Sequence, residues 1–214
     1  MKRIITILAV LVWSIGAFAQ TAQEIVSRME ATMQTPEQYE KNGLAMTMEM
    51  KMPIVGTISS RALTKGDYMR VDVFKAGKTA AISWRDGKTD WSYDLEKNTI
   101  EITNITPATK DASKTDADIA MFEGVTKGYD VSIKKETADA WYIRCKKNKD
   151  NTEKDDPKTM ELVVEKGTYK PLSLSAKVSI VSVTIRDLSY GVSDEQIIFH
   201  PENYPNATVI DKRQ

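Results

Sequence analysis

The sequence has very little of the residues on which most enzyme sites depend. Its 214 residues include one cysteine, Cys145, and one histidine, His200. A hydrolase of the serine or cysteine type needs a base beside its nucleophile, and His200 is the only histidine that could serve. A single histidine also excludes histidine-rich zinc sites. The phosphate-binding loop, the glycine-rich dinucleotide turn, the H-E-x-x-H zinc motif and the nucleophile elbow are also absent. We therefore predict that the protein is not an enzyme and uses no cofactor and no metal ion.

One cysteine also excludes an internal disulfide, so packing must stabilise the fold. Cys145 alternates with Trp141 and Ile143 in a strand-like stretch, which predicts a buried structural thiol. Carboxylates are plentiful, so a glycosidase-like acid pair stays open as an alternative. Asp86, Asp90 and Asp94, however, lie at hairpin ends or on the polar face of a strand, where contact with solvent explains them better.

No hydrophobic run is long enough to span a bilayer. The longest run, Ile4 to Trp13, is about half of the roughly 20 residues that a spanning helix needs. Lys2 and Arg3 precede it and Ala17-Phe18-Ala19 follows, which predicts a secretory signal peptide (residues 1–19) cleaved after Ala19. No cysteine directly follows the run at the expected cleavage site, so we expect no lipid anchor and a mature chain of one domain, residues 20–214.

The chain also lacks an excess of charge of either sign. It has 30 lysines and arginines and 30 aspartates and glutamates, and removal of Lys2 and Arg3 with the signal peptide leaves 28 − 30 = −2. Binding to a phosphate backbone needs a concentrated basic surface, which this balance does not predict. We therefore expect no nucleic-acid partner.

Methionine, by contrast, is concentrated in one strand-like stretch, Leu-Ala-Met-Thr-Met-Glu-Met-Lys-Met. Strand side chains alternate between faces, so Thr47, Glu49 and Lys51 point one way and the apolar residues point the other. Methionine is flexible and polarizable, and it recurs on surfaces that accept more than one apolar partner. Two interpretations remain open for this stripe, ordinary core packing and a ligand-lining wall. Its residues are Leu44, Met46, Met48, Met50 and Met52.

Short strand patterns separated by turn residues follow one another along the chain. Arg85-Asp86-Gly87-Lys88 is the sharpest turn signal, because Asp-Gly tolerates the positive φ of a tight hairpin. A helix is expected at 21–33, behind a capping box of Thr21 and Glu24, and a second at 116–122. Strands are expected at 44–52, 57–64, 68–74, 79–84, 88–94, 99–103, 129–135, 140–147, 159–165, 172–179 and 183–190. The fold class predicted is mainly β: a strongly curved antiparallel sheet or unclosed β-barrel of about eleven strands, covered by two helical segments.

A curved sheet of this size can enclose more volume than its own side chains fill, and such a space suits an apolar ligand. We expect the methionine stripe to form one wall of this hydrophobic cavity. Five further residues are candidates for its lining: Met69, Val71, Trp84, Trp91 and Trp141.

Two stretches resemble a known family. The run from Ile82 to Asn98 contains Asp86-Gly87-Lys88-Thr89 before an aromatic strand, and it is similar to the central hairpin of the LolA-type outer-membrane lipoprotein carriers. The ending resembles that family too, with Phe199, Pro201 and the closing run Val209 to Arg213. The likeness extends over essentially the whole mature chain.

The resemblance implies an unclosed β-barrel with a helix-covered cavity, and a periplasmic carrier or chaperone for the acyl chains of lipoproteins. It implies as partners acylated lipoproteins or lipid, an inner-membrane lipoprotein-releasing transporter and an outer-membrane acceptor, and it implies a monomer. The two covering helices would act as lids, with the candidates Ile25, Met29, Met33, Ile119, Met121 and Phe122.

The sequence departs from the family at one turn. The family has an arginine in a basic-proline turn that closes the empty cavity, whereas this chain has Lys65-Gly66-Asp67. Alternation places the nearby Arg70 away from Met69 and Val71. An alternative function also stays open: a lipid-responsive envelope sensor or interaction module on the same open-barrel fold.

Overall fold

The computed structural model describes residues 20–33, 35–106, 125–154 and 156–213. The expected signal peptide and the expected helix at 116–122, with Ile119, Met121 and Phe122, lie outside these residues. No helix in the described ranges is both long enough and apolar enough to cross a membrane.

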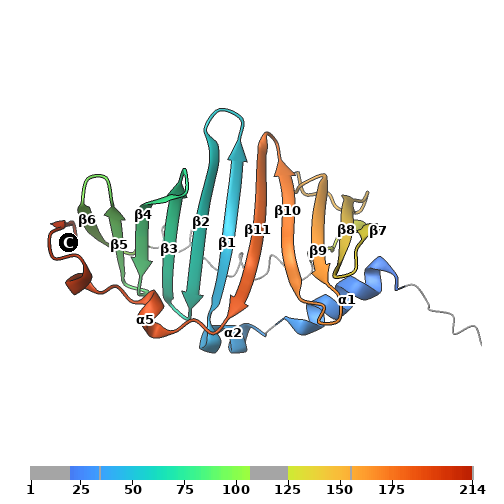
Figure 1. Cartoon of the computed structure of the whole chain (residues 1–214), viewed down its shortest axis with the longest axis horizontal. Helices are drawn as coiled ribbons and strands as arrows, with labels where there is room; N and C mark the ends of the chain where they lie inside the picture. Colours follow the sequence, from blue (N-terminus) through green and yellow to red (C-terminus); the bar gives the residue numbers. More distant parts are fainter. Residues whose placement is uncertain (1–19, 34, 107–124, 155, 214) are drawn as a thin grey trace, which may run out of the picture.

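One twelve-stranded sheet makes up most of the molecule (Figure 1). Its spatial order is β12-β6-β5-β4-β3-β2-β1-β11-β10-β9-β8-β7, so β1 and β11 bring the two halves of the chain together. The strands are β1 (Leu44–Met52), β2 (Gly56–Lys65), β3 (Tyr68–Lys75), β4 (Lys78–Arg85), β5 (Thr89–Asp94), β6 (Thr99–Asn104), β7 (Tyr129–Glu136), β8 (Ala140–Lys147), β9 (Thr159–Glu165), β10 (Pro171–Val178), β11 (Val181–Tyr190) and β12 (Thr208–Asp211).

Within the described part of the chain, the two end strands β7 and β12 do not pair, so the sheet is open. All neighbours are antiparallel except β12, which runs parallel to β6. The predicted mainly β, unclosed fold is confirmed. The strand that the sequence did not predict is β12, because its four residues are all exposed and show no alternation.

The predicted hairpin at Asp86-Gly87 is also confirmed. The Asp86 carboxylate accepts hydrogen bonds from the backbone N–H groups of Lys88 and Thr89, at 2.9 and 2.8 Å. Gly87 has φ +86°, and a Cβ there would lie 2.9 Å from the Cβ of Asp67. The ion pair between Arg85 and Asp90, at 2.6 Å, joins the two strands beside the turn.

The register divides the sheet into two faces. Met46 is paired with Ala62, which is paired with Val71, so these residues share a face with the methionine stripe. We call this the methionine face. The residues between them in each strand point to the opposite side, which we call the tryptophan face because Trp84 and Trp91 lie on it.

Helix α1 (Ala22–Thr32) covers the methionine face near β7 and β9. The predicted capping box is present, since the Thr21 hydroxyl accepts from the Glu24 N–H and the Glu24 carboxylate accepts from the Thr21 N–H. Its apolar stripe enters a large core with strand residues that include Met46, Ile143 and Leu162. The helix α2 (Pro36–Asn42) follows and contacts β2.

The C-terminal segment covers part of the tryptophan face. It contains α5 (Asp194–Ile197), which contacts β2 and β3, and the 3-10 helix η1 (Pro201–Asn203). A second, smaller core forms there from Ala45, Leu63, Val192 and Ile197. Figure 1 shows this segment running along one edge of the sheet to β12.

Candidate functional site

The methionine stripe runs from a closed end to an open end. At the start of β1, Leu44 and Met46 are buried in the core under α1. Met48, Met50 and Met52 are only half-buried as the strand approaches its hairpin. Burial therefore falls along one strand face, which leaves apolar side chains accessible toward one edge of the sheet.

An apolar pocket of about 380 Å³ lies beside this stripe. Its wall continues the methionine face, because Ile185 is paired with Met48 and Val183 with Met50. On the next strand, Leu174 and Ala176 face the same space. The residues that line the pocket are Val125, Lys127, Tyr129, Asp156, Pro157, Met160, Leu174, Ala176, Val178, Val183 and Ile185.

The polar residues of this pocket are Lys127, Tyr129 and Asp156, which come from the start of β7 and the segments before β7 and β9. The Tyr129 hydroxyl donates a hydrogen bond of 3.0 Å to the Pro157 carbonyl, which ties β7 to the segment before β9. Burial raises the pKa of Tyr129, with a smaller effect from Asp156, so its hydroxyl stays neutral. Gly128 has φ +79° and lies against Asn151, where a Cβ would meet another side-chain carbon at 2.8 Å. These contacts fix the two segments relative to each other, while the lining residues from β9, β10 and β11 are all apolar.

Helix α1 closes the other end of the apolar surface. Ile25 and Met29 are fully buried, and Met33 is half-buried against the same core. The Tyr190 hydroxyl lies 3.9 Å from the sulfur of Met33. On another side of the helix, the Arg28 guanidinium lies over the Tyr169 ring, at 5.2 Å from its centroid, and donates to the Tyr169 hydroxyl at 2.8 Å. The helix is thus held to the sheet by both apolar and polar contacts.

The structure brings together most of the residues predicted to line a cavity. Met69 is paired with Thr64, which is paired with Leu44, so Met69 lies on the methionine face. Trp141 belongs to the core under α1 and stacks on Tyr169. The residues on this face are Leu44, Met46, Met48, Met50, Met52, Met69, Val71 and Trp141.

Trp84 and Trp91 do not join them. They are cross-strand partners on the tryptophan face, where Phe199 contacts both rings at centroid distances of 5.1 and 5.3 Å. Tyr204 completes the cluster at 5.5 Å from Trp84. The prediction that these two tryptophans share a surface with the methionines is corrected, because the C-terminal segment covers them on the other side of the sheet.

Sequence reasoning missed the residues that form most of the pocket. Met160, Leu174, Ala176, Val183 and Ile185 come from β9, β10 and β11. Alternation within those strands places each of them on one face, but it does not reveal that β11 pairs with β1. The pairing of the two halves of the chain is what joins these residues to the methionine stripe.

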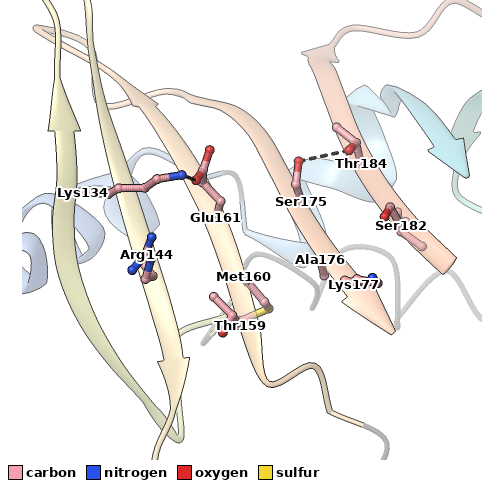
Figure 2. Close-up of a pocket in the computed structure, with 11 residues that line it drawn as sticks. Lys134, Arg144, Thr159, Met160, Glu161, Ser175, Ala176, Lys177, Ser182 and Thr184 are labelled. Atoms are coloured by element: carbon pink, nitrogen blue, oxygen red, sulfur yellow. Dashed lines mark hydrogen bonds and ion pairs between the residues drawn. The ribbon is translucent and has the colours of Figure 1, made fainter. Parts of the chain in front are cut away.

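A second pocket, of about 400 Å³, is lined mainly by polar residues from β7 to β11 (Figure 2). Figure 2 shows Lys134 directed to Glu161, and Ser175 bonded to Thr184 at 3.0 Å. Glu161, Ser175 and Thr184 are register partners and lie on the tryptophan face. This pocket offers hydroxyls and charged groups, and none of the polar side chains that line it is fully buried to fix a ligand.

The cysteine and the histidine considered in the sequence lie in different parts of the fold. Cys145 is fully buried in the core under α1, where burial raises the pKa of its thiol to about 11. His200 lies in the C-terminal segment, with its Nδ1 3.0 Å from the Glu202 carboxylate. Among the described residues, no group of three or more histidine, cysteine, aspartate or glutamate side chains could hold a metal ion.

Arg70 takes part in a contact that the sequence partly anticipates. Its side chain lies on the tryptophan face, as alternation predicts, with Nε 2.8 Å from the Asp72 carboxylate. It also donates to the Gln196 carbonyl at 3.1 Å and lies over the Trp84 ring, at 5.6 Å from its centroid. Arg70 thus holds α5 to the sheet on the face opposite the methionines.

No protein-family model matches this chain, and no curated protein sequence does. Solved structures do match. An uncharacterised conserved protein from Thermus thermophilus is 16% identical over 89% of this chain and 99% of its own, with a TM-score of 0.42. A LolA superfamily protein from Nitrosomonas europaea is 11% identical over 85% and 99%, with a TM-score of 0.33. The Mycobacterium tuberculosis lipoprotein LppX is 8% identical over 80% and 97%, with a TM-score of 0.48.

A LolA superfamily protein is thus among the solved structures to which this chain is similar. Each identity is 16% or less and each TM-score is below 0.5. No function is therefore carried over from these proteins to this one.

Proposed function

We propose that this protein is a periplasmic carrier that holds the acyl chains of lipoproteins on its methionine face and delivers them toward the outer membrane. The observation that carries the proposal is the apolar pocket of about 380 Å³ whose wall continues into Met48 and Met50. An acyl chain has no polar group to satisfy, so a wall of methionine, valine and isoleucine side chains is sufficient to bind it.

A carrier must also release its cargo. Binding and release both proceed only if the free-energy difference between the loaded and empty states is small. Flexible methionine side chains make contacts with many poses of a chain instead of one rigid fit. The half-buried part of the stripe supports such weak, adaptable binding, since it is accessible without unfolding the core.

Helix α1 is assigned to the wall of this site. Ile25, Val26 and Met29 are fully buried, so a movement of the whole helix would expose three large apolar side chains to water. Cargo that enters beside α1, over Ile185 and Val183, avoids that cost. The donor would be an inner-membrane lipoprotein-releasing transporter and the recipient an outer-membrane acceptor, with the carrier acting as a monomer.

The direct test is a titration of the mature chain, residues 20–214, with a synthetic triacylated lipopeptide. The same peptide without acyl chains is the control. We expect saturable binding of the lipopeptide alone, and we expect Ala176→Phe, which fills the pocket, to weaken this binding while the fold is unchanged. Equal binding of both peptides, or of neither, would contradict the proposal. Tighter binding of a free fatty acid than of the lipopeptide would restrict the function to lipid transport.

A further inference from the structure

Two neighbouring hairpins carry the most exposed apolar side chains of the described chain. Ile54 is 99% exposed and Val55 64%, in the turn between β1 and β2, and Ile180 is 66% exposed in the turn between β10 and β11. A group of exposed apolar side chains at neighbouring turns gains nothing for the fold of the free protein. Its place therefore needs a separate explanation.

The pairing of β1 with β11 brings these turns to the same edge of the sheet. Lys51 is paired with Ser182, so the residues that follow Lys51 and those that precede Ser182 extend beyond the sheet side by side. Figure 1 shows both hairpins projecting at the top of the sheet, next to each other. We call Ile54, Val55 and Ile180 the apolar tip.

Lysines lie on the strands that lead to this edge of the sheet. Lys51 and Lys177 lie beside the two hairpins. Lys75 and Lys78 flank the next turn, between β3 and β4. This turn is at the same edge of the sheet, because Lys75 is paired with Ile58 near the start of β2. All four are exposed, and none of them makes an ion pair within the described ranges. The three turns, residues 52–56, 76–77 and 178–181, contain no acidic residue.

The tip also lies at the open end of the proposed binding surface. Val178, which precedes the β10 to β11 turn, lines the apolar pocket, and Met52 ends the methionine stripe just before the β1 to β2 turn. A chain that slides out along the methionine face therefore leaves the protein beside the two hairpins.

We propose that the apolar tip inserts into the surface of a bilayer with anionic headgroups, while the surrounding lysines bind those headgroups. Apolar side chains at a projecting turn suit the boundary between headgroups and acyl chains, and basic residues beside them add attraction to anionic lipid. This docking rests on the proposed function for its purpose, because it opens the pocket directly onto the membrane. Membrane binding itself requires only the apolar tip and the nearby lysines, not the proposed carrier function.

Flotation of the mature protein with vesicles tests the docking. Vesicles of phosphatidylethanolamine with phosphatidylglycerol should bind the protein, and phosphatidylcholine vesicles should bind it more weakly. Ile54→Ser with Ile180→Ser should lower binding about tenfold or more. Lys75→Gln with Lys78→Gln should lower binding to the anionic vesicles by about fivefold for each lysine and reduce its sensitivity to salt. Val209→Ser is the matched control, since Val209 is 59% exposed on β12 at a distant end of the sheet.

Wild-type protein that stays unbound to the anionic vesicles would overturn the proposal, and so would equal binding by the tip variant and the Val209→Ser control. Lipopeptide titration without vesicles separates this result from the proposed function. The tip variant should keep its lipopeptide affinity, because Ile54 and Ile180 do not line the pocket. Lost lipopeptide binding with normal vesicle binding would refute the carrier and leave the docking in place.

Discussion

Replacing Met48 with aspartate places a carboxylate on the proposed binding wall. Met48 is half-buried between its register partners Ser60 and Ile185, so in the empty protein the new carboxylate reaches water and the sheet stays folded. An acyl chain that covers this position removes that water. The carboxylate must then be desolvated or take up a proton.

The free energy needed to protonate the introduced aspartate gives the upper limit of the affinity loss. An aspartate of ordinary pKa near 3.9 is about three units below pH 7, and protonation there costs about 4 kcal/mol. This corresponds to an affinity loss of about a thousandfold. A chain that shifts along the adaptable wall to avoid the carboxylate loses less, so we expect a loss between about tenfold and a thousandfold. Lowering the pH toward 4 should restore binding, because the protonated carboxyl is neutral.

Lipopeptide titration followed by tryptophan fluorescence measures this loss, and circular dichroism checks the fold. Thr47→Asp is the matched control, since it adds the same charge one residue away on the tryptophan face, opposite Arg61 and Arg186. Its lipopeptide affinity should stay within about twofold of wild type. Equal affinities for Met48→Asp and Thr47→Asp, with both variants folded, would refute the binding wall.

Three further predictions concern the surroundings of this wall. Met29→Ala should lower the free energy of unfolding by about 2–5 kcal/mol, because the Met29 side chain is fully buried between α1 and the sheet. Chemical denaturation measures this loss, with Ser27→Ala as the control because Ser27 is exposed on the same helix. Trp84→Ala should cost about 3–5 kcal/mol of stability, because it removes the contacts with Phe199 and Tyr204. Lipopeptide affinity should change less than twofold, since Trp84 lies on the opposite face of the sheet. A large affinity loss in a folded variant would contradict that placement. Burial raises the pKa of the Cys145 thiol to about 11 from an ordinary value of about 9, so unfolding between pH 9 and 11 releases a proton. The free energy of unfolding should therefore fall across this range more steeply in wild type than in Cys145→Ala. Denaturant titrations at several pH values measure this difference.

Much of the fold follows from local patterns in the sequence. Alternation in Leu44–Met52 gives the strand and its two faces, and Asp86-Gly87 gives the hairpin turn whose N–H groups the Asp86 carboxylate binds. Thr21 and Glu24 fix the start of α1. Each of these signals acts within a few residues of chain, which is why the sequence alone carries it.

The composition of the site depends on pairing between distant segments. Trp84 and Met46 are both apolar strand residues, and only the register through β2 and β3 shows that they point to opposite faces. The pocket requires β11 to lie beside β1, although Val183 and Met50 are far apart in the chain. Phe199 contacts the tryptophans from a segment with little regular structure, so no periodic pattern in the sequence predicts that contact.

The proposed carrier function is tested most directly by native mass spectrometry of the protein, purified gently from its own host, followed by organic extraction of the released material. We expect a bound acylated species whose amount falls in the Met48→Asp variant. A protein that is free of ligand, and that stays free after incubation with lipopeptide, would contradict it and return the methionine face to ordinary core packing.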